Sequence, residues 1–344
     1  MKARTQNTYR QHLRPLLPRE AFQPNPRKLI SVAVNLALAV GCIFCLSLNP
    51  SIFETAVLVL LIGHLFAANG FLAHEVSHGN VIRNRRGRYV LELVTWLPVM
   101  ISPAMWHRLH NVAHHAHVNT VHDPDRRFLL TDAGSTAPHF ARHFYPNSEI
   151  IAWTPLPFLY FLPYLVRNNA AAFLRKPLPI SHTVPQFSRR DRTACAGEWV
   201  LLISVHAVFF ALAGFSITFY LTAFIYPVIV ASVIFVSFVA TQHWLNPIHD
   251  VADPLLGSTS VRVPRVIDAV YHNVSWHTEH HLFPQLNPDW YPAVGRLLKQ
   301  HYGEHYNSIS MGEAWRRLWR SARFAEKRQQ DAISSIKHKA PVGD

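Results

Sequence analysis

The chain has little cysteine and little charge. Only three of its 344 residues are cysteine, and 15% are Asp, Glu, Lys or Arg. Cys42 and Cys45 form a C-x-x-C pair inside an uncharged apolar stretch, where we expect them to pack as small apolar side chains, and Cys195 is isolated. This pattern excludes a cysteine-ligated iron–sulfur cluster and a disulfide framework. Electrons for any redox chemistry would therefore have to come from a separate protein.

The scarcity of charge leaves apolar runs of unusual length. The longest, residues 199–241, contains no Asp, Glu, Lys or Arg. A helix needs about 20 apolar residues to cross the hydrocarbon core of a bilayer, so this run is long enough for two spans with a turn near 214–220. The sequence predicts an all-α integral membrane protein with four transmembrane helices, at 29–48, 56–73, 199–218 and 221–241.

The charges that are present predict the orientation. Residues 49–51 allow only a tight hairpin between the first two spans, so we expect two hairpins with both termini on one side. Residues 1–28 carry seven Lys and Arg, whereas the two hairpin tips carry none. By the positive-inside rule, the side with the termini is expected to be cytoplasmic.

The chain has a formal net charge of +13 at pH 7. Its basic residues flank the apolar runs, and no nucleic-acid-binding motif is present, so anionic lipid headgroups are the expected partner and nucleic acid is not. After residue 313 aromatic and basic residues alternate, which is typical of an interfacial helix, although a solvated terminal helix fits equally well. Two further apolar segments, 89–106 and 150–166, are expected to lie in the membrane interface, the second because it contains three prolines.

Histidine is abundant and clustered. Three short motifs, HEVSH, HNVAHH and HTEHH, contain His74, His78, His110, His114, His115, His277, His280 and His281. Residues four apart share one face of a helix, so each motif presents several rings to the same side, and a doubled histidine can reach two adjacent ions. Neutral imidazole is a common ligand of transition metals, and eight rings exceed the needs of one ion. The motifs predict a metalloenzyme with two metal ions at the face that carries the termini.

The choice of metal separates two classes of enzyme. HEVSH matches the zinc metallopeptidase signature H-E-x-x-H, in which Glu75 would act as the general base. A peptidase would need one more ligand, however, and would leave the other two motifs unexplained. A pair of irons can bind dioxygen and attack an unactivated C–H bond, which redox-inert zinc cannot do. Because the site would lie where membrane helices emerge, the expected substrate is a lipid.

The three motifs and four spans together resemble the membrane fatty acid desaturase family, over about residues 29–302. The segments WHRLHNVAHHAHVN and YHNVSWHTEHHLFP around the second and third motifs are similar too. The resemblance implies a non-haem di-iron enzyme that uses O2 and two electrons to introduce a C=C bond into an acyl chain. It also implies a ninth ligand, His243, at the end of the fourth span. The chain would then comprise a basic cytoplasmic N-terminal segment (1–28), a membrane desaturase domain (29–312) and a basic C-terminal tail (313–344).

Two details indicate which members of the family the chain resembles. The third motif begins with His277, whereas desaturases that act on the carboxyl side of an existing double bond commonly have glutamine there. The chain also lacks the haem-binding H-P-G-G of a fused cytochrome domain. A separate ferredoxin or cytochrome, with its reductase, is therefore the expected electron donor.

Two other functions are compatible with clustered histidines. Hydroxylation of a lipid or hydrocarbon would use the same ligands, whereas in a metal transporter the ligands would line a path through the spans.

Other polar residues are expected to have supporting roles. His64 and His206 are expected to form hydrogen bonds between helices, and His122, Asp123 and Asp125 to brace a loop. Residues expected to orient the metal ligands are Glu75, His107, His117, His272 and Asn273.

Overall fold

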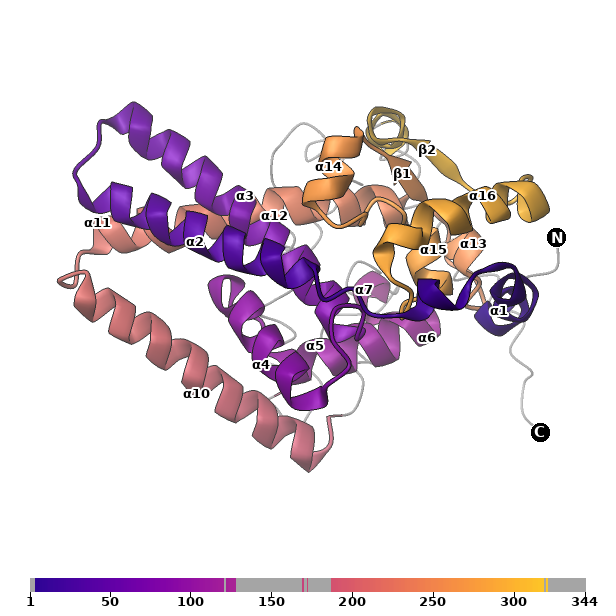
Figure 1. Cartoon of the computed structure of the whole chain (residues 1–344), viewed down its shortest axis with the longest axis horizontal. Helices are drawn as coiled ribbons and strands as arrows, with labels where there is room; N and C mark the ends of the chain where they lie inside the picture. Colours follow the sequence, from indigo (N-terminus) through magenta and orange to yellow (C-terminus); the bar gives the residue numbers. More distant parts are fainter. Residues whose placement is uncertain are drawn as a thin grey trace, which may run out of the picture.

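The computed structural model describes residues 4–120, 122–127, 169, 172, 187–318 and 320. The predicted interfacial segment 150–166 and almost all of the C-terminal tail lie outside these residues. The described chain is mostly helical. Long helices extend to one end of the molecule, and short helices with a small sheet form a cap at the other end (Figure 1).

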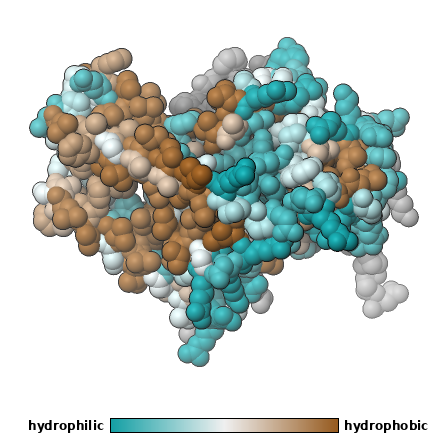
Figure 2. Space-filling view, in the orientation of Figure 1, coloured by the Kyte–Doolittle hydropathy of each residue, from teal (hydrophilic) through white to brown (hydrophobic). Residues whose placement is uncertain are grey.

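Among the described residues, four helices are long and apolar enough to cross a membrane, which confirms the predicted number. The first three are α2 (Lys28–Ser47), α3 (Ile52–Ser77) and α10 (Arg189–Leu212). The fourth is a continuous run of α11 (Ile217–Tyr220), η7 (Leu221–Ile225), α12 (Tyr226–Val239) and η8 (Ala240–Trp244). Figure 2 shows apolar surface gathered over this end of the molecule and polar surface over the cap, as expected of a protein that contacts lipid on one part only.

The third long helix differs from the predicted span 199–218 at both ends. The third helix begins at Arg189, well before residue 199, because Ser188 and Asp191 form a capping box at its start. Glu198, which bounds the uncharged run, is buried within this helix. The buried Glu198 carboxylate accepts hydrogen bonds from Tyr89 Oη (3.0 Å), Ser102 Oγ (2.5 Å) and the Ala104 amide (3.0 Å). The third helix also ends at Leu212, and the turn follows directly, with Gly214 at φ +65°.

The segment after the first histidine motif is sharply bent. It consists of α4 (Arg85–Trp96), η3 (Leu97–Val99), α5 (Pro103–Trp106), η4 (His107–His114) and α6 (His115–His117). Its two arms, 85–99 and 103–117, meet at 99°. Met100 has a left-handed backbone (φ 54°) at the bend. Residues 89–106 are therefore not one straight span, and the bend directs the second motif toward the end of α3.

The cap is formed by segments from both ends of the described chain. Its elements are α1 (Gln6–Leu13), η1 (Arg14–Leu16), η2 (Arg19–Phe22), α7 (Pro124–Arg127), α13 (Pro254–Gly257), β1 (Ser260–Arg262), α14 (Arg265–Val270), α15 (His277–Leu282), η9 (Pro288–Trp290), α16 (Tyr291–Tyr302) and β2 (Ser308–Ser310). Strands β1 and β2 pair in parallel, with Val261 opposite Ile309. Tyr9 and Leu13 of α1 are fully buried in the same apolar cluster as Leu282 of α15. The N-terminal segment is thus packed directly behind the third histidine motif.

Close packing of α3 against α12 fixes the position of the first motif. A Cβ atom added to Gly63 would lie 2.5 Å from Val230 Cβ and 2.8 Å from the Pro227 carbonyl oxygen. Two turns further along, Gly70 lies against the ring of Phe235. Only glycine permits this approach of the two backbones, as is common where membrane helices pack.

Gly63→Ala is expected to destabilise the protein, because overpacking a tight core typically costs about 1–3 kcal/mol. The measurement is the midpoint of thermal unfolding of the purified protein in detergent. Gly41→Ala is the matched control, since Gly41 lies in α2 with nothing within 4 Å of its added Cβ. Equal midpoints for both variants would contradict the proposed close contact between α3 and α12.

Candidate metal centre

The three histidine motifs lie on three elements that converge at one end of the long helices. His74 and His78 occupy the last turn and the cap of α3, and His277, His280 and His281 lie on α15. The second motif lies on η4, a π-helical segment in which the amide of His115 donates to the carbonyl oxygen of His110. This i to i+5 hydrogen bond widens the helical turn that carries the motif, a feature found often at functional sites.

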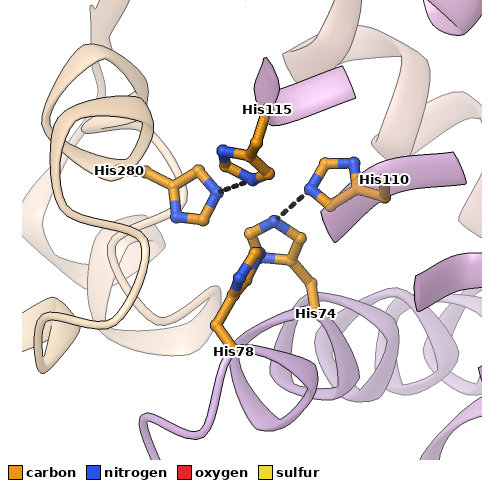
Figure 3. A group of neighbouring side chains, drawn as sticks. All are labelled: His74, His78, His110, His115 and His280. Carbon is orange, nitrogen blue, oxygen red and sulfur yellow. Dashed lines mark hydrogen bonds between the residues drawn. The ribbon is translucent and has the colours of Figure 1, made fainter. Parts of the chain in front are cut away.

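Five of the rings form a first group: His74, His78, His110, His115 and His280. They point toward one another from α3, from the second motif and from α15 (Figure 3). The Nε2 atoms of His74 and His110 lie 2.9 Å apart, and those of His280 and His115 lie 3.1 Å apart. One nitrogen of every ring in the group lies within 4.8 Å of the others.

The other four rings form a second group: His114, His243, His277 and His281. All four are buried. His277 Nε2 lies 2.6 Å from His243 Nε2 and 3.2 Å from His281 Nε2. The ring of His114 lies 4.9 Å from those of His243 and His281. Each doubled histidine is divided between the two groups, since His115 and His280 belong to the first, and their neighbours His114 and His281 to the second.

The outward nitrogens of several rings contact fixed acceptors. His74 Nδ1 lies 2.9 Å from Glu75 Oε1, and His114 Nδ1 lies 2.9 Å from Asp123 Oδ1. Tyr291 Oη lies 3.0 Å from His280 Nδ1 and donates to Glu75 Oε2 at 3.4 Å. Hydrogen bonds of this kind hold the proton on Nδ1, so the lone pair of Nε2 faces the centre of the group.

Electrostatics favour cation binding at both groups. Burial, with the charge that neighbouring histidines would carry, lowers the pKa of His280 and His281 well below the usual value. These rings are therefore neutral at pH 7, which is the form that binds metal. Burial also opposes a charge on His114, but the carboxylates of Asp123 and Asp125 outweigh it and raise the pKa of His114 to about 9. The same carboxylates would stabilise a metal cation.

The donor set fits transition-metal ions. At a metal–nitrogen distance of about 2.1 Å, adjacent donors of one ion lie about 3 Å apart, close to the Nε2 separations in both groups. Buried His78 Nε2 has no hydrogen-bond partner within the described part of the chain. A bound ion would satisfy this nitrogen, which would otherwise carry the free-energy penalty of burial.

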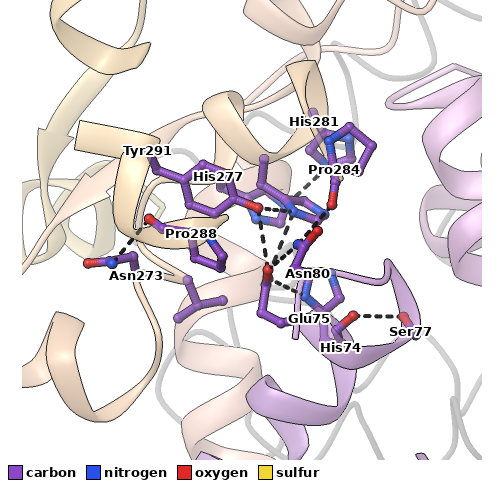
Figure 4. Close-up of polar contacts among 12 residues, drawn as sticks. His74, Glu75, Ser77, Asn80, Asn273, His277, His281, Pro284, Pro288 and Tyr291 are labelled. Carbon is purple, nitrogen blue, oxygen red and sulfur yellow. Dashed lines mark hydrogen bonds and ion pairs between the residues drawn. The ribbon is translucent and has the colours of Figure 1, made fainter. Parts of the chain in front are cut away.

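The residues expected to orient the ligands lie in different surroundings. Glu75 is buried and contacts His74, Asn80 and Tyr291 (Figure 4). By contrast, His107 and His117 are exposed and belong to neither group. His272 and Asn273 have consecutive left-handed backbones (φ 56° and 61°), and Asn273 Nδ2 donates to the Pro288 carbonyl oxygen. These two residues shape the loop that leads to α15.

Sequence reasoning missed three contacts at the centre. Tyr291 and Asn80 reach Glu75 from other elements, which no local pattern indicates. Asp123 was expected only to brace its loop; it also accepts from the Asn119 amide (2.8 Å) and contacts His114. The carboxylates of Asp123 and Asp125 lie within a few residues of the second motif, and this proximity was the available signal.

An apolar cavity of about 100 Å³ lies beside both groups. Its histidine wall consists of His74, His110, His114, His243 and His277, and its other lining residues include Phe71, Phe235, Val236 and Val239. The cavity therefore joins the histidine groups to the packed faces of α3 and α12. An apolar chain of small cross-section could occupy it.

The comparisons with known proteins agree with this geometry. A sequence model described as fatty acid desaturase matches residues 53–312. This range contains all nine grouped histidines. No match to a curated protein was found.

Glu75→Gln is expected to weaken metal binding in the first group by about 10–100-fold, because it removes the charged acceptor of His74. The measurement is the metal retained by the purified protein during titration with a chelator. Glu54→Gln, at the opposite end of α3, is the matched control and should retain metal as the unsubstituted protein does. Unchanged retention by the Glu75 variant would show that this carboxylate does not orient His74.

Proposed function

The chain belongs to the fatty acid desaturase family, and on that premise we propose that it introduces a C=C bond into the acyl chain of a lipid. In this proposal nine histidines hold two irons, five in the first group and four in the second. The observation that carries the proposal is the pair of nitrogen-only groups beside an apolar cavity. Nitrogen donors in excess of one ion suit a redox-active metal pair.

The metal pair and the protein would have separate tasks. An iron pair held by these histidines would supply the redox chemistry for reducing dioxygen to two waters: the substrate would give up two hydrogens, and a donor protein and the solvent would supply the other two electrons and two protons. The chain itself would hold the acyl segment against the apolar wall that includes Phe71 and Phe235, and would exclude water from it. Glu75 and Asp123 would keep the rings of His74 and His114 in the orientation that binds metal.

We further propose that the cap faces the cytoplasm, with the four long helices as two hairpins in the bilayer. Seven Lys and Arg in residues 1–28 favour this side, and α1 of that segment packs on the cap. A separate ferredoxin or cytochrome, supplied by its reductase, would deliver electrons there.

Two alternatives fit the site less well. In a zinc peptidase the Glu75 carboxylate would have to face a water molecule, yet it is engaged by His74, Asn80 and Tyr291. In a metal transporter, ligands would follow the spans, whereas both groups lie at one end of them. Hydroxylation would use the same ligands as desaturation, and the products distinguish the two reactions.

Protein purified under mild conditions is expected to contain close to two irons per chain, and chelation should remove both the iron and the activity. Elemental analysis and oxygen consumption with reductant and lipid are the measurements. Stoichiometric zinc in an active preparation, with activity that does not require oxygen, would refute the di-iron proposal.

Alanine at either His281 or His243 is expected to abolish product, because an incomplete second group cannot hold its ion. The readout is the acyl composition of a heterologous host that expresses each variant. His206→Ala should retain much activity, since His206 lies away from both groups and contacts only the Leu97 carbonyl oxygen (3.2 Å) and Tyr220 Oη (3.0 Å) among the hydrogen-bond partners given by the described chain. A fully active His281→Ala enzyme would contradict the ligand assignment.

A further inference from the structure

Three polar atoms around the apolar cavity have no hydrogen-bond partner in the part of the chain that the structure describes. They are the Nε1 atoms of Trp96 and Trp106 and the Oε1 atom of Gln242. All three residues line the cavity that also borders the histidine groups. The walls of the cavity thus contain two donors and one acceptor that no described group satisfies.

These groups are deeply buried and close to the histidines. Trp96 is 2% exposed and Gln242 is 1% exposed. The Trp106 ring stacks on His110 with centroids 4.5 Å apart, and Trp96 lies 4.8 Å from Trp106. Gln242 precedes His243 on η8, and its Nε2 donates to the Val274 carbonyl oxygen at 2.7 Å, so Oε1 is the atom that lacks a partner.

Leaving an indole N–H unpaired is unfavourable, and two other tryptophans of the described chain have a partner. The indole of Trp199 donates to Asn169 Oδ1 at 2.7 Å, and that of Trp276 donates to Asp268 Oδ2 at 3.3 Å. Buried polar groups in native proteins are usually paired, and the exceptions tend to mark a functional contact. An unsubstituted hydrocarbon chain in the cavity would leave all three atoms unpaired.

We propose that the preferred substrate carries an oxygen atom, as a hydroxyl or keto group, on the hydrocarbon chain beside the position that reacts. Either group would accept from the indole N–H of Trp96 or Trp106, and a hydroxyl could also donate to Gln242 Oε1. This inference rests on the proposed function and specifies its substrate class. Trp96, Trp106 and Gln242 then act as residues that determine specificity.

The test compares octadecanoyl lipids in phosphatidylcholine vesicles, either unsubstituted or with one hydroxyl or keto group at successive carbons. With the iron-loaded protein and reductant, kcat/KM is expected to be highest for one position of the oxygen and lower for the unsubstituted chain. Trp106→Phe and Trp96→Phe keep an aromatic ring, smaller than the indole, but remove the donor. Each should lower the ratio of kcat/KM for the best oxygenated chain to kcat/KM for the unsubstituted chain by about 3- to 10-fold, the effect of one lost hydrogen bond.

Binding without turnover provides a second readout. The same lipids are competed against a labelled octadecanoyl chain on the anaerobic, iron-loaded protein without reductant, and the oxygenated chain should lose its advantage in the Trp106 variant. Trp290→Phe in η9 is the matched control, because Trp290 does not line the cavity, and it should leave both ratios unchanged. Because each ratio is taken on one preparation, a partly folded variant does not obscure the result.

Three outcomes would overturn the inference. One is a wild-type protein that binds and converts unsubstituted chains at least as well as every oxygenated chain. Another is a tryptophan variant that lowers binding and turnover of both lipids equally, which would assign the indole donors to an ordered water. The third is an unchanged ratio in both tryptophan variants. In each case, iron-dependent conversion of the unsubstituted chain would leave the proposed desaturase function standing, whereas no conversion of any lipid would refute that function itself.

Discussion

The molecule depends on one constraint: imidazole nitrogens must converge on two points that lie within a few ångströms of each other. A ring offers its Nε2 lone pair inward only if Nδ1 carries the proton, and the buried acceptors Glu75 and Asp123 favour that proton on two of the rings. Adjacent histidines then serve different groups, because one helical step turns the side chains of His114 and His115 about 100° apart. The two groups are consequently one connected structure, in which the position of each ring depends on its neighbours.

The rest of the fold holds three distant segments at this point. The glycine contacts of α3 with α12 fix the end of α3, which carries His74, relative to η8, which carries His243. The bend after α4 brings the second histidine motif to the end of α3. Glu198 of α10 holds this bend by accepting hydrogen bonds from Tyr89, Ser102 and the Ala104 amide. From the opposite side α1 packs behind α15, and Arg10 Nε donates to the Leu282 carbonyl oxygen at 2.5 Å. Apolar helix packing thus positions a polar centre that could not form from any one segment.

Much of this was predictable from the sequence, for identifiable reasons. Uncharged runs indicated four long helices, and histidines four apart indicated shared faces, because both patterns are local. His243 was found only through the resemblance to a family, since a lone histidine at the end of a span has no local signature. The start of α10 was missed because Glu198 was treated as excluded from a buried helix, yet three donors compensate its burial. Tyr291 and the unpaired indoles depend on tertiary contacts, which no spacing in the sequence reveals.

The central claim is that the nine histidines bind two separate ions, five around one and four around the other. Anomalous X-ray scattering at the iron edge, measured on crystals of the iron-loaded protein, tests it most directly. The account predicts two peaks, one among His74, His78, His110, His115 and His280 and the other among His114, His243, His277 and His281. A single peak, or a peak held by His110, His114 and Asp125 in place of these two, would contradict it.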